Sequence, residues 1–155
     1  MTEQIKLKYP RVMAEKDLYI TPQDKKKKFV LNPALYFFPR LLKIVINSGK
    51  TAQKGKYGPV EWVQSSLDIL DALEESGIRL EVTGMHNLSS FDGPAVFVSN
   101  HMSTLETVAL PSLIQPVKEV TFVVKQELLK YPFFRDILGA RTPIVVGRSN
   151  PREDL

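Results

Sequence analysis

A histidine and a carboxylate near the middle of the chain have the types and the spacing that suit acid–base chemistry. His101 precedes Glu106 by five positions, within the run NHMSTLE at residues 100–106. A carboxylate that accepts a proton from one imidazole nitrogen fixes the tautomer and stabilises the imidazolium. The other ring nitrogen can then deprotonate an alcohol. The pair therefore predicts a general base that needs no covalent enzyme intermediate.

This pair can make contact only in one local geometry. On a regular helix, five residues turn the chain by about 140°, so the two side chains would not share a face. They meet if His101 lies in a turn and Glu106 lies in the first turn of the following helix. Ser103 is a good N-cap residue and predicts that break. The positive end of the helix would then favour a neutral imidazole near pH 7.

A second interpretation uses the same residues for structure alone. Ser103 and Glu106 fit a capping box, in which the glutamate reaches back to the serine amide and leaves His101 alone. A histidine and an acid five positions apart are by themselves a weak motif, so the sequence leaves both interpretations open. His86, in a turn-rich stretch, has no acidic residue at that spacing and is predicted to be a surface-loop histidine.

Alternating elements surround the pair and predict an α/β fold, with a largely parallel sheet and crossover helices. The continuous apolar run Ala95–Ser99 is expected to be a strand buried on both faces. Ligands of such sheets bind at the carboxyl ends of strands, which is where Asn100 and His101 fall. The other expected strands are 79–83, 120–124 and 143–146, and the expected helices are 59–76, 103–113 and one beginning at 126–131.

The expected helix at 59–76 has the clearest pattern in the chain. Apolar residues recur at spacings of three and four and make a single stripe. Pro59 suits a first helical position, and Gly77 is a plausible stop. Trp62 is expected to pack beside the stripe without a functional role. The stripe consists of Val60, Val63, Leu67, Leu70 and Leu73.

A helical N-terminal segment is expected before this domain. The mostly apolar stretch Phe29–Ile46 follows the basic run Lys25–Lys28. Two prolines and two cations interrupt the stretch, and a charge at the bilayer centre costs about 2.5–3.5 kcal/mol. We therefore expect it to lie on a membrane surface beside anionic lipids and not to span the membrane. A plain buried helix is the alternative.

Asn47–Gly58 is expected to be a linker because it holds several glycines and lysines. The expected division is a polar and basic arm with an apolar membrane-associating segment over residues 1–58, and a second domain over residues 59–155.

The composition narrows the classes of function. The 155 residues suit one modest domain, and the absence of cysteine excludes disulfides, thiolate metal sites and a cysteine nucleophile. The net charge of +4 favours anionic partners. Nucleic acid is disfavoured because the lysine run has no interleaved aromatic residues. One histidine with one carboxylate is too small a ligand set for a catalytic metal, and no bound cofactor is expected.

Several segments in order resemble one family. Residues 100–106, with the pattern Asn-His-x-Ser-x-x-Glu, resemble the first block of the 1-acylglycerol-3-phosphate acyltransferase family, Asn-His-x-Ser-x-x-Asp. The stretch from Gly139 through PIVVGR at 143–148 is similar to the second block, which ends in an arginine. The lead-in segments at 84–88 and 93–99 and the intervening segments at 125–128 and 132–134 also match, so the resemblance covers about Leu80–Arg148.

This resemblance implies transfer of a fatty acyl group to a hydroxyl of a glycerol phosphate lipid. The donor would be a thioester of coenzyme A or of acyl carrier protein. His101 carries over as the general base, Glu106 as the residue that orients it, and Arg148 as a ligand of the acceptor phosphate. The protein would act at an anionic membrane surface, peripherally and on the cytoplasmic side. The further candidate substrate-binding residues are Asn100, Ser103 and Lys125.

Two departures from the family pattern matter. Glu106 stands where the family usually has aspartate, and its side chain is one methylene longer. The third block, Phe-Pro-Glu-Gly-Thr-Arg, does not occur. We therefore expect residues 59–155 to be the front half of an incomplete acyltransferase domain, marginally stable and with little or no activity alone. The alternative function is a non-catalytic membrane-surface module derived from that fold.

Overall fold

The structure, a computed structural model, describes Tyr9, residues 17–25 and residues 32–147. Lys26–Lys28 and Arg148 lie outside the described residues. The described part mixes helices with short strands, which confirms the α/β class in its coarse form. In chain order the elements are β1 (Leu18–Ile20), α2 (Pro33–Gln53), α3 (Pro59–Glu75), β2 (Glu81–Thr83), the 3-10 helix η2 (Met85–Leu88), α4 (Leu105–Ile114), β3 (Val123–Lys125), the 3-10 helix η3 (Gln126–Lys130), α5 (Phe134–Gly139) and β4 (Ile144–Val146).

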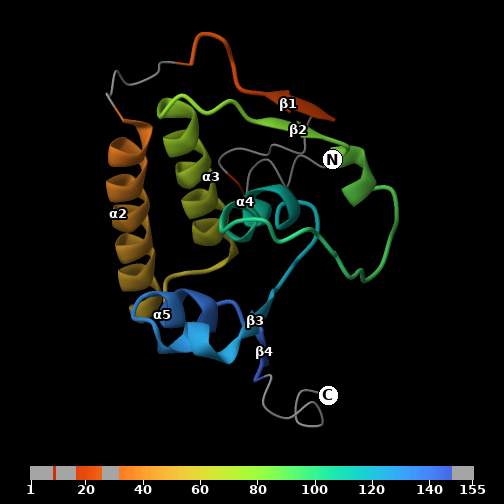
Figure 1. Ribbon diagram of the computed structural model, residues 1–155. Coiled ribbons are helices and arrows are strands. Elements are labelled where there is room, and N and C mark those ends of the chain that lie inside the picture. The colour runs from red at the N-terminus through yellow and green to blue at the C-terminus, as the bar shows by residue number, and fades with distance from the viewer. Residues whose placement is uncertain (1–8, 10–16, 26–31, 148–155) are drawn as a thin grey trace.

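Helix α3 lies at the centre and packs against both α2 and α4 (Figure 1). Its predicted bounds and apolar stripe are confirmed. Pro59 is its first residue, and Gly77 follows its end with φ of 99°, a conformation that favours glycine. Four stripe residues are buried with Tyr9 in the main core, and Val60 packs against them partly buried. The four are Val63, Leu67, Leu70 and Leu73.

Helix α2 is longer than the sequence predicted. Asn32 caps it, because its Oδ1 accepts a hydrogen bond from the Ala34 N–H at 2.9 Å. The helix continues to Gln53, so the linker expected over Asn47–Gly58 is wrong for most of its length. Gly49 is buried, and a Cβ there would lie 2.6 Å from the Cβ of Phe133. Close packing against the segment before α5 therefore overrides the local composition.

Strands of the described residues form two separate pairs and not one largely parallel sheet. β1 pairs with β2 antiparallel, and β3 pairs with β4 parallel, with η3 and α5 between them in the chain. Figure 1 shows the two pairs at opposite ends of the helices. The strands expected at 79–83 and 143–146 are shortened to β2 and β4, and the strand expected at 120–124 is shortened and shifted by one residue to β3.

The strand expected at Ala95–Ser99 is wrong. These residues have no strand hydrogen bonds in the structure, and Val96 and Val98 are each 90% exposed. An apolar run supplies side chains for a strand but not the neighbour that must accept its backbone hydrogen bonds. β3 is paired with β4, and within the described residues no strand lies against 95–99. The chain therefore approaches His101 as an exposed stretch without regular secondary structure.

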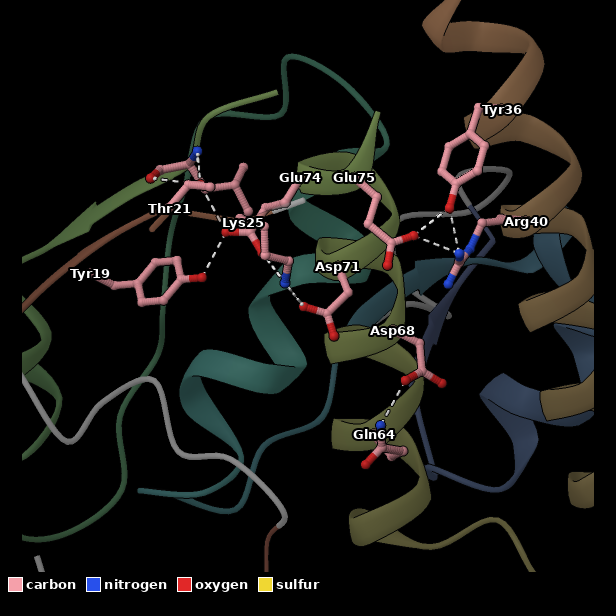
Figure 2. A network of polar contacts seen from close by, with 11 residues as sticks. Tyr19, Thr21, Lys25, Tyr36, Arg40, Gln64, Asp68, Asp71, Glu74 and Glu75 are labelled. Carbon is pink, nitrogen blue, oxygen red and sulfur yellow. Dashed lines mark hydrogen bonds and ion pairs between the residues drawn. The ribbon is translucent and has the colours of Figure 1, made fainter. Parts of the chain in front are cut away.

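Polar contacts fasten the segment before α2 to α3 (Figure 2). Glu74 of α3 is 1% exposed, and its Oε1 accepts hydrogen bonds from the Tyr19 hydroxyl at 2.6 Å and the Thr21 hydroxyl at 2.8 Å. Lys25 lies 2.7 Å from Asp71 and 3.0 Å from Glu74. The buried carboxylate thus holds β1 and the residues after it on α3.

Candidate active site

Helix α4 carries Glu106 in its first turn, and Ser66 of α3 holds this helix in position. Ser66 donates its hydroxyl hydrogen bond to the carbonyl of Ala109 at 3.1 Å and accepts one from the Ser112 N–H at 3.2 Å. Pro111 lies within α4 and has no N–H to donate, so this stretch of the helix has fewer hydrogen bonds of its own. The contact holds the middle of α4 against α3, and at the start of the helix the Leu105 N–H donates to the Ser103 hydroxyl at 3.0 Å.

His101 and Glu106 are in contact. The Nδ1 of His101 lies 2.9 Å from Oε1 of Glu106, with the histidine before α4 and the glutamate in its first turn. The same oxygen accepts a hydrogen bond from the Ser103 N–H at 3.0 Å. The capping interaction and the histidine contact therefore coexist, although they were expected from the sequence as alternatives. The additional methylene of glutamate does not prevent the contact.

Ser103 faces Glu106. Its hydroxyl donates to Oε2 of Glu106 at 2.9 Å and accepts from the Leu105 N–H at 3.0 Å. Ser103 therefore holds the carboxylate in place, besides any contact with a substrate.

The carboxylate of Glu106 is strongly favoured in its charged form. The pKa of Glu106 is lowered to about 2, chiefly by the backbone N–H of Ser103, then by its own backbone N–H, with smaller contributions from the Ser103 hydroxyl and His101. An ionised carboxylate can only accept, so the Nδ1 of His101 carries the proton in this contact. Within the described residues the Nε2 of His101 has no hydrogen-bond partner, and the side chain is 76% exposed. That nitrogen is available to accept a proton.

A largely apolar cavity of about 620 Å³ lies next to this pair, and His101 is part of its lining. The volume falls within the range of about 300–1,000 Å³ typical of ligand pockets. Side chains from α2, α3, α4, β3 and α5 form the walls, among them Ile44, Ile69, Val108, Val124 and Leu138. An imidazole with an unoccupied nitrogen thus borders a space suited to an apolar ligand.

Among the other predicted site residues that the structure describes, Ser103 lines this cavity, whereas Asn100 and Lys125 do not. Asn100 is exposed directly before His101, and Lys125 is exposed at the end of β3. Arg148, the predicted phosphate ligand of the second block, lies outside the described residues, so the structure does not test its position. Within the described part of the chain, no group of three or more histidines and acids could hold a metal ion.

His86 has an acidic partner after all. Its Nδ1 lies 2.6 Å from Oδ1 of Asp17, which comes from the segment that leads into β1. Local spacing gave no signal for this contact because the two residues are far apart in the chain. The pair does not line the cavity, so it is a contact between η2 and the N-terminal segment.

Trp62 and Arg141 line the cavity, although neither residue was expected from the sequence to have a functional role. The guanidinium carbon of Arg141 lies 4.8 Å from the centre of the Trp62 ring. The two residues come from α3 and from the turn before β4, and no local pattern connects them.

The depressed pKa of Glu106 predicts how stability depends on pH. An acid whose folded pKa is lowered stabilises the fold above its ordinary value, and this contribution is lost as pH falls toward about 2. We expect Glu106→Gln to lower the thermal unfolding midpoint at pH 7. The difference from the unsubstituted protein should narrow as pH falls from 5 toward 3. A constant difference over that range, in thermal scans followed by circular dichroism, would contradict the charged contact.

Comparison with known proteins matches the region that contains this site. Residues 79–154 match the family model described as Acyltransferase. A 77-residue stretch is 40% identical to a 1-acyl-sn-glycerol-3-phosphate acyltransferase of Pseudomonas aeruginosa, covering 50% of this chain and 28% of that relative. The match thus spans little more than a quarter of the relative's length. No solved structure matches the chain.

Proposed function

This chain belongs to the acyltransferase family through residues 79–154, and from that premise we propose that it transfers a fatty acyl group from an acyl thioester to a hydroxyl of a glycerol phosphate lipid. The observation that carries the proposal is the 2.9 Å contact between Nδ1 of His101 and an ionised Glu106, at the border of an apolar cavity. The name of the relative supports a glycerol phosphate acceptor.

In this mechanism His101 acts as the general base. Its Nε2 removes the proton of the acceptor hydroxyl while the hydroxyl oxygen attacks the thioester carbonyl carbon. Glu106 holds the ring in the required tautomer and stabilises the imidazolium that forms. Collapse of the tetrahedral intermediate breaks the carbon–sulfur bond, and the imidazolium returns the proton to the leaving thiolate. An ester and a free thiol are the products, and His101 is again neutral.

The cavity supplies the apolar part of the site. Its walls are mostly apolar side chains, which favour an acyl chain over water at about 25 cal/mol per Å² of apolar surface buried. Arg148, by its place in the second block, is proposed to bind the acceptor phosphate, and Asn100 and Lys125 to contact the substrates. The donor is the thioester of coenzyme A or of acyl carrier protein, and no bound cofactor takes part.

The proposal is tested by an acyl-transfer assay. The protein is incubated with a 1-acylglycerol phosphate and a labelled acyl thioester, either of coenzyme A or of acyl carrier protein, and the diacyl product is separated. Because the third block of the family pattern does not occur in this sequence, we expect only a small amount of labelled diacylglycerol phosphate, from at least one donor, and none when the free hydroxyl of the acceptor is blocked. Absence of product with both donors, from protein that unfolds cooperatively, contradicts the proposal.

We further propose that α2 lies on an anionic membrane surface, on its cytoplasmic side. Leu35, Phe38 and Leu42 recur at spacings of three and four on α2, and they are 74%, 62% and 60% exposed. Such a stripe on one helix suits insertion at the interface of a bilayer. Within the described residues, no helix is long and apolar enough to cross a membrane.

Substituting the exposed stripe is expected to weaken membrane binding. The double substitution Phe38→Ser and Leu42→Ser should lower binding to vesicles of anionic phospholipid about 10-fold or more, because each side chain loses apolar burial in the bilayer. Co-sedimentation with the vesicles measures the effect. Val96→Ser, which replaces an even more exposed apolar residue outside α2, is the control and should leave binding unchanged. Equal binding by all three proteins would contradict a membrane role for α2.

The same vesicles separate the enzyme from the non-catalytic membrane module. An enzyme bearing His101→Ala loses transfer and keeps vesicle binding. A module shows no transfer in any variant, and its vesicle binding depends only on the stripe of α2.

A further inference from the structure

Arg141 is the one lysine, arginine or acidic residue in the cavity lining, among the residues that the structure describes. It lies between α5 and β4, and hydrogen bonds fix its backbone on both sides. Its N–H donates to the carbonyl of Leu138 at 2.9 Å, and its own carbonyl accepts from the Thr121 hydroxyl at 2.9 Å. The backbone that carries the guanidinium is therefore fixed in position.

The residue after Arg141 has a backbone conformation that its side chain disfavours. Thr142 has φ of 45°, in the left-handed region that a β-branched residue rarely adopts. The Thr121 hydroxyl also contacts the Thr142 carbonyl, at 3.1 Å. Backbone strain of this kind persists where the surrounding structure imposes it, and it is concentrated at functional sites.

The guanidinium of Arg141 is positioned by stacking. Its central carbon lies 4.8 Å from the centre of the Trp62 ring, and Trp62 is 7% exposed and packs edge-on against Phe122 with centroids 5.4 Å apart. A guanidinium held over the face of a buried ring is restricted in its orientation, and its N–H donors point outward in the guanidinium plane.

The positive charge of Arg141 is not compensated. Within the described residues, no carboxylate lies within ion-pair distance of it, whereas Arg40 pairs with Glu75 and Arg135 pairs with Asp136. Its Nη2 donates to the neutral Gln115 Oε1 at 3.3 Å, and its Nε is buried with no hydrogen-bond partner among the residues that the structure describes. A charge in a largely apolar wall is costly unless an opposite charge joins it. The arrangement thus favours an anion in the cavity.

We propose that Arg141 binds a phosphate group of a substrate inside the cavity that His101 borders. This inference rests on the proposed acyl transfer, because both substrates of that reaction carry phosphate. A guanidinium recognises phosphate oxygens through parallel hydrogen bonds. The phosphate comes either from the acceptor lipid or from the pantetheine-bearing donor, and the two sources can be separated experimentally.

The chain contains its own reporter for this site. Trp62 is the single tryptophan of the sequence, and Arg141 stacks on it, so a ligand at the guanidinium should change its fluorescence. The protein is titrated with 1-acylglycerol phosphate against phosphate-free 1-acylglycerol, and with coenzyme A against pantetheine. We expect the phosphate-bearing member of one pair to bind about 10–100-fold more tightly, the range for hydrogen bonds to charged groups. The pair that shows the difference identifies the source.

Substitutions establish whether Arg141 carries the preference. Arg141→Gln is expected to abolish the difference within the pair, and Arg141→Lys to restore only part of it, since lysine keeps the charge but loses the planar fork. Arg135→Gln, which removes an exposed arginine that already has Asp136 as a partner, is the matched control and should keep the full preference. Should Arg141→Gln not fold, Arg141→Lys still decides the matter.

Failure of this inference can be told apart from failure of the proposed function. His101→Ala should leave the phosphate preference intact while it removes acyl transfer. Phosphate preference without acyl transfer would overturn the enzymatic proposal and leave the Arg141 site standing. No preference in either ligand pair, or an unchanged preference in Arg141→Gln, would overturn the Arg141 site.

Discussion

Replacing His101 with alanine is expected to lower the rate of acyl transfer by about 10²–10⁴-fold, the usual contribution of a positioned general base. The variant removes the Nε2 that accepts the hydroxyl proton. It leaves the Ser103 N–H and hydroxyl on Glu106, so the start of α4 should keep its structure. The measurement is the initial rate of diacyl product formation, with the thermal unfolding midpoint as a check on the fold.

His86→Ala is the matched control for this experiment. It removes the other histidine of the chain, which also contacts an acid, Asp17, at 2.6 Å, but which does not line the cavity. We expect the transfer rate of His86→Ala to stay within about twofold of the unsubstituted protein, since the residue makes no contact with the reacting atoms. Equal loss in both variants would indicate a general effect on folding. Unchanged transfer in His101→Ala would exclude His101 as the base.

Local patterns predicted the parts of the molecule whose contacts are close in sequence. The stripe that contains Val63 and Leu67 defined α3 because helical periodicity is written into neighbouring residues. The contact of His101 with Glu106 was predictable for the same reason, since a serine at position 103 places the helix start between them.

Distant contacts were not predictable from the sequence. Whether the apolar run at 95–99 becomes a strand depends on a neighbouring strand, which the run itself does not specify. The extension of α2 to Gln53 depends on Phe133 packing against Gly49, more than 80 residues away. The stacking of Arg141 on Trp62 likewise joins two elements that only the folded chain brings together. The family resemblance predicted the reaction and the residues that carry it. The cavity and the position of Arg141 in its wall depend on contacts between distant segments, which the sequence does not reveal.

Glu74→Ala is expected to lower the stability of the fold strongly. Glu74 is 1% exposed and accepts hydrogen bonds from Tyr19 and Thr21, and its Oε2 lies 3.0 Å from the Lys25 ammonium without hydrogen-bond geometry (Figure 2). Removing one member of a buried ion pair leaves its partners without compensation and costs about 3–5 kcal/mol. We expect about 3 kcal/mol here, the low end, because the Lys25 side chain is 25% exposed and keeps Asp71.

The neighbouring carboxylate provides the control. Glu75 pairs with Arg40 at 2.6 Å, but the arginine side chain is 41% exposed, so Glu75→Ala should cost no more than about 1 kcal/mol. Chemical denaturation of both variants gives the two free energies of unfolding. If both substitutions lower the free energy of unfolding equally, the burial of Glu74 does not determine how much this residue stabilises the fold.

The substitution Glu74→Gln tests whether the ion pair between Lys25 and Glu74 stabilises the fold. Glutamine keeps an acceptor for the Tyr19 and Thr21 hydroxyls but removes the negative charge. Burial alone would lower the pKa of Lys25, and the hydrogen bond to Asp71 and the negative charges of Asp71 and Glu74 more than offset it, so the pKa is raised above 10.5. A raised lysine pKa stabilises the fold fully below the ordinary value and loses this contribution as pH rises through the folded value. The stability difference between Glu74→Gln and the unsubstituted protein should therefore be constant from pH 6 to 9 and shrink above about 10.5. A difference that persists unchanged in strongly alkaline solution would show that the glutamate acts through its hydrogen bonds and not through the charge of Lys25.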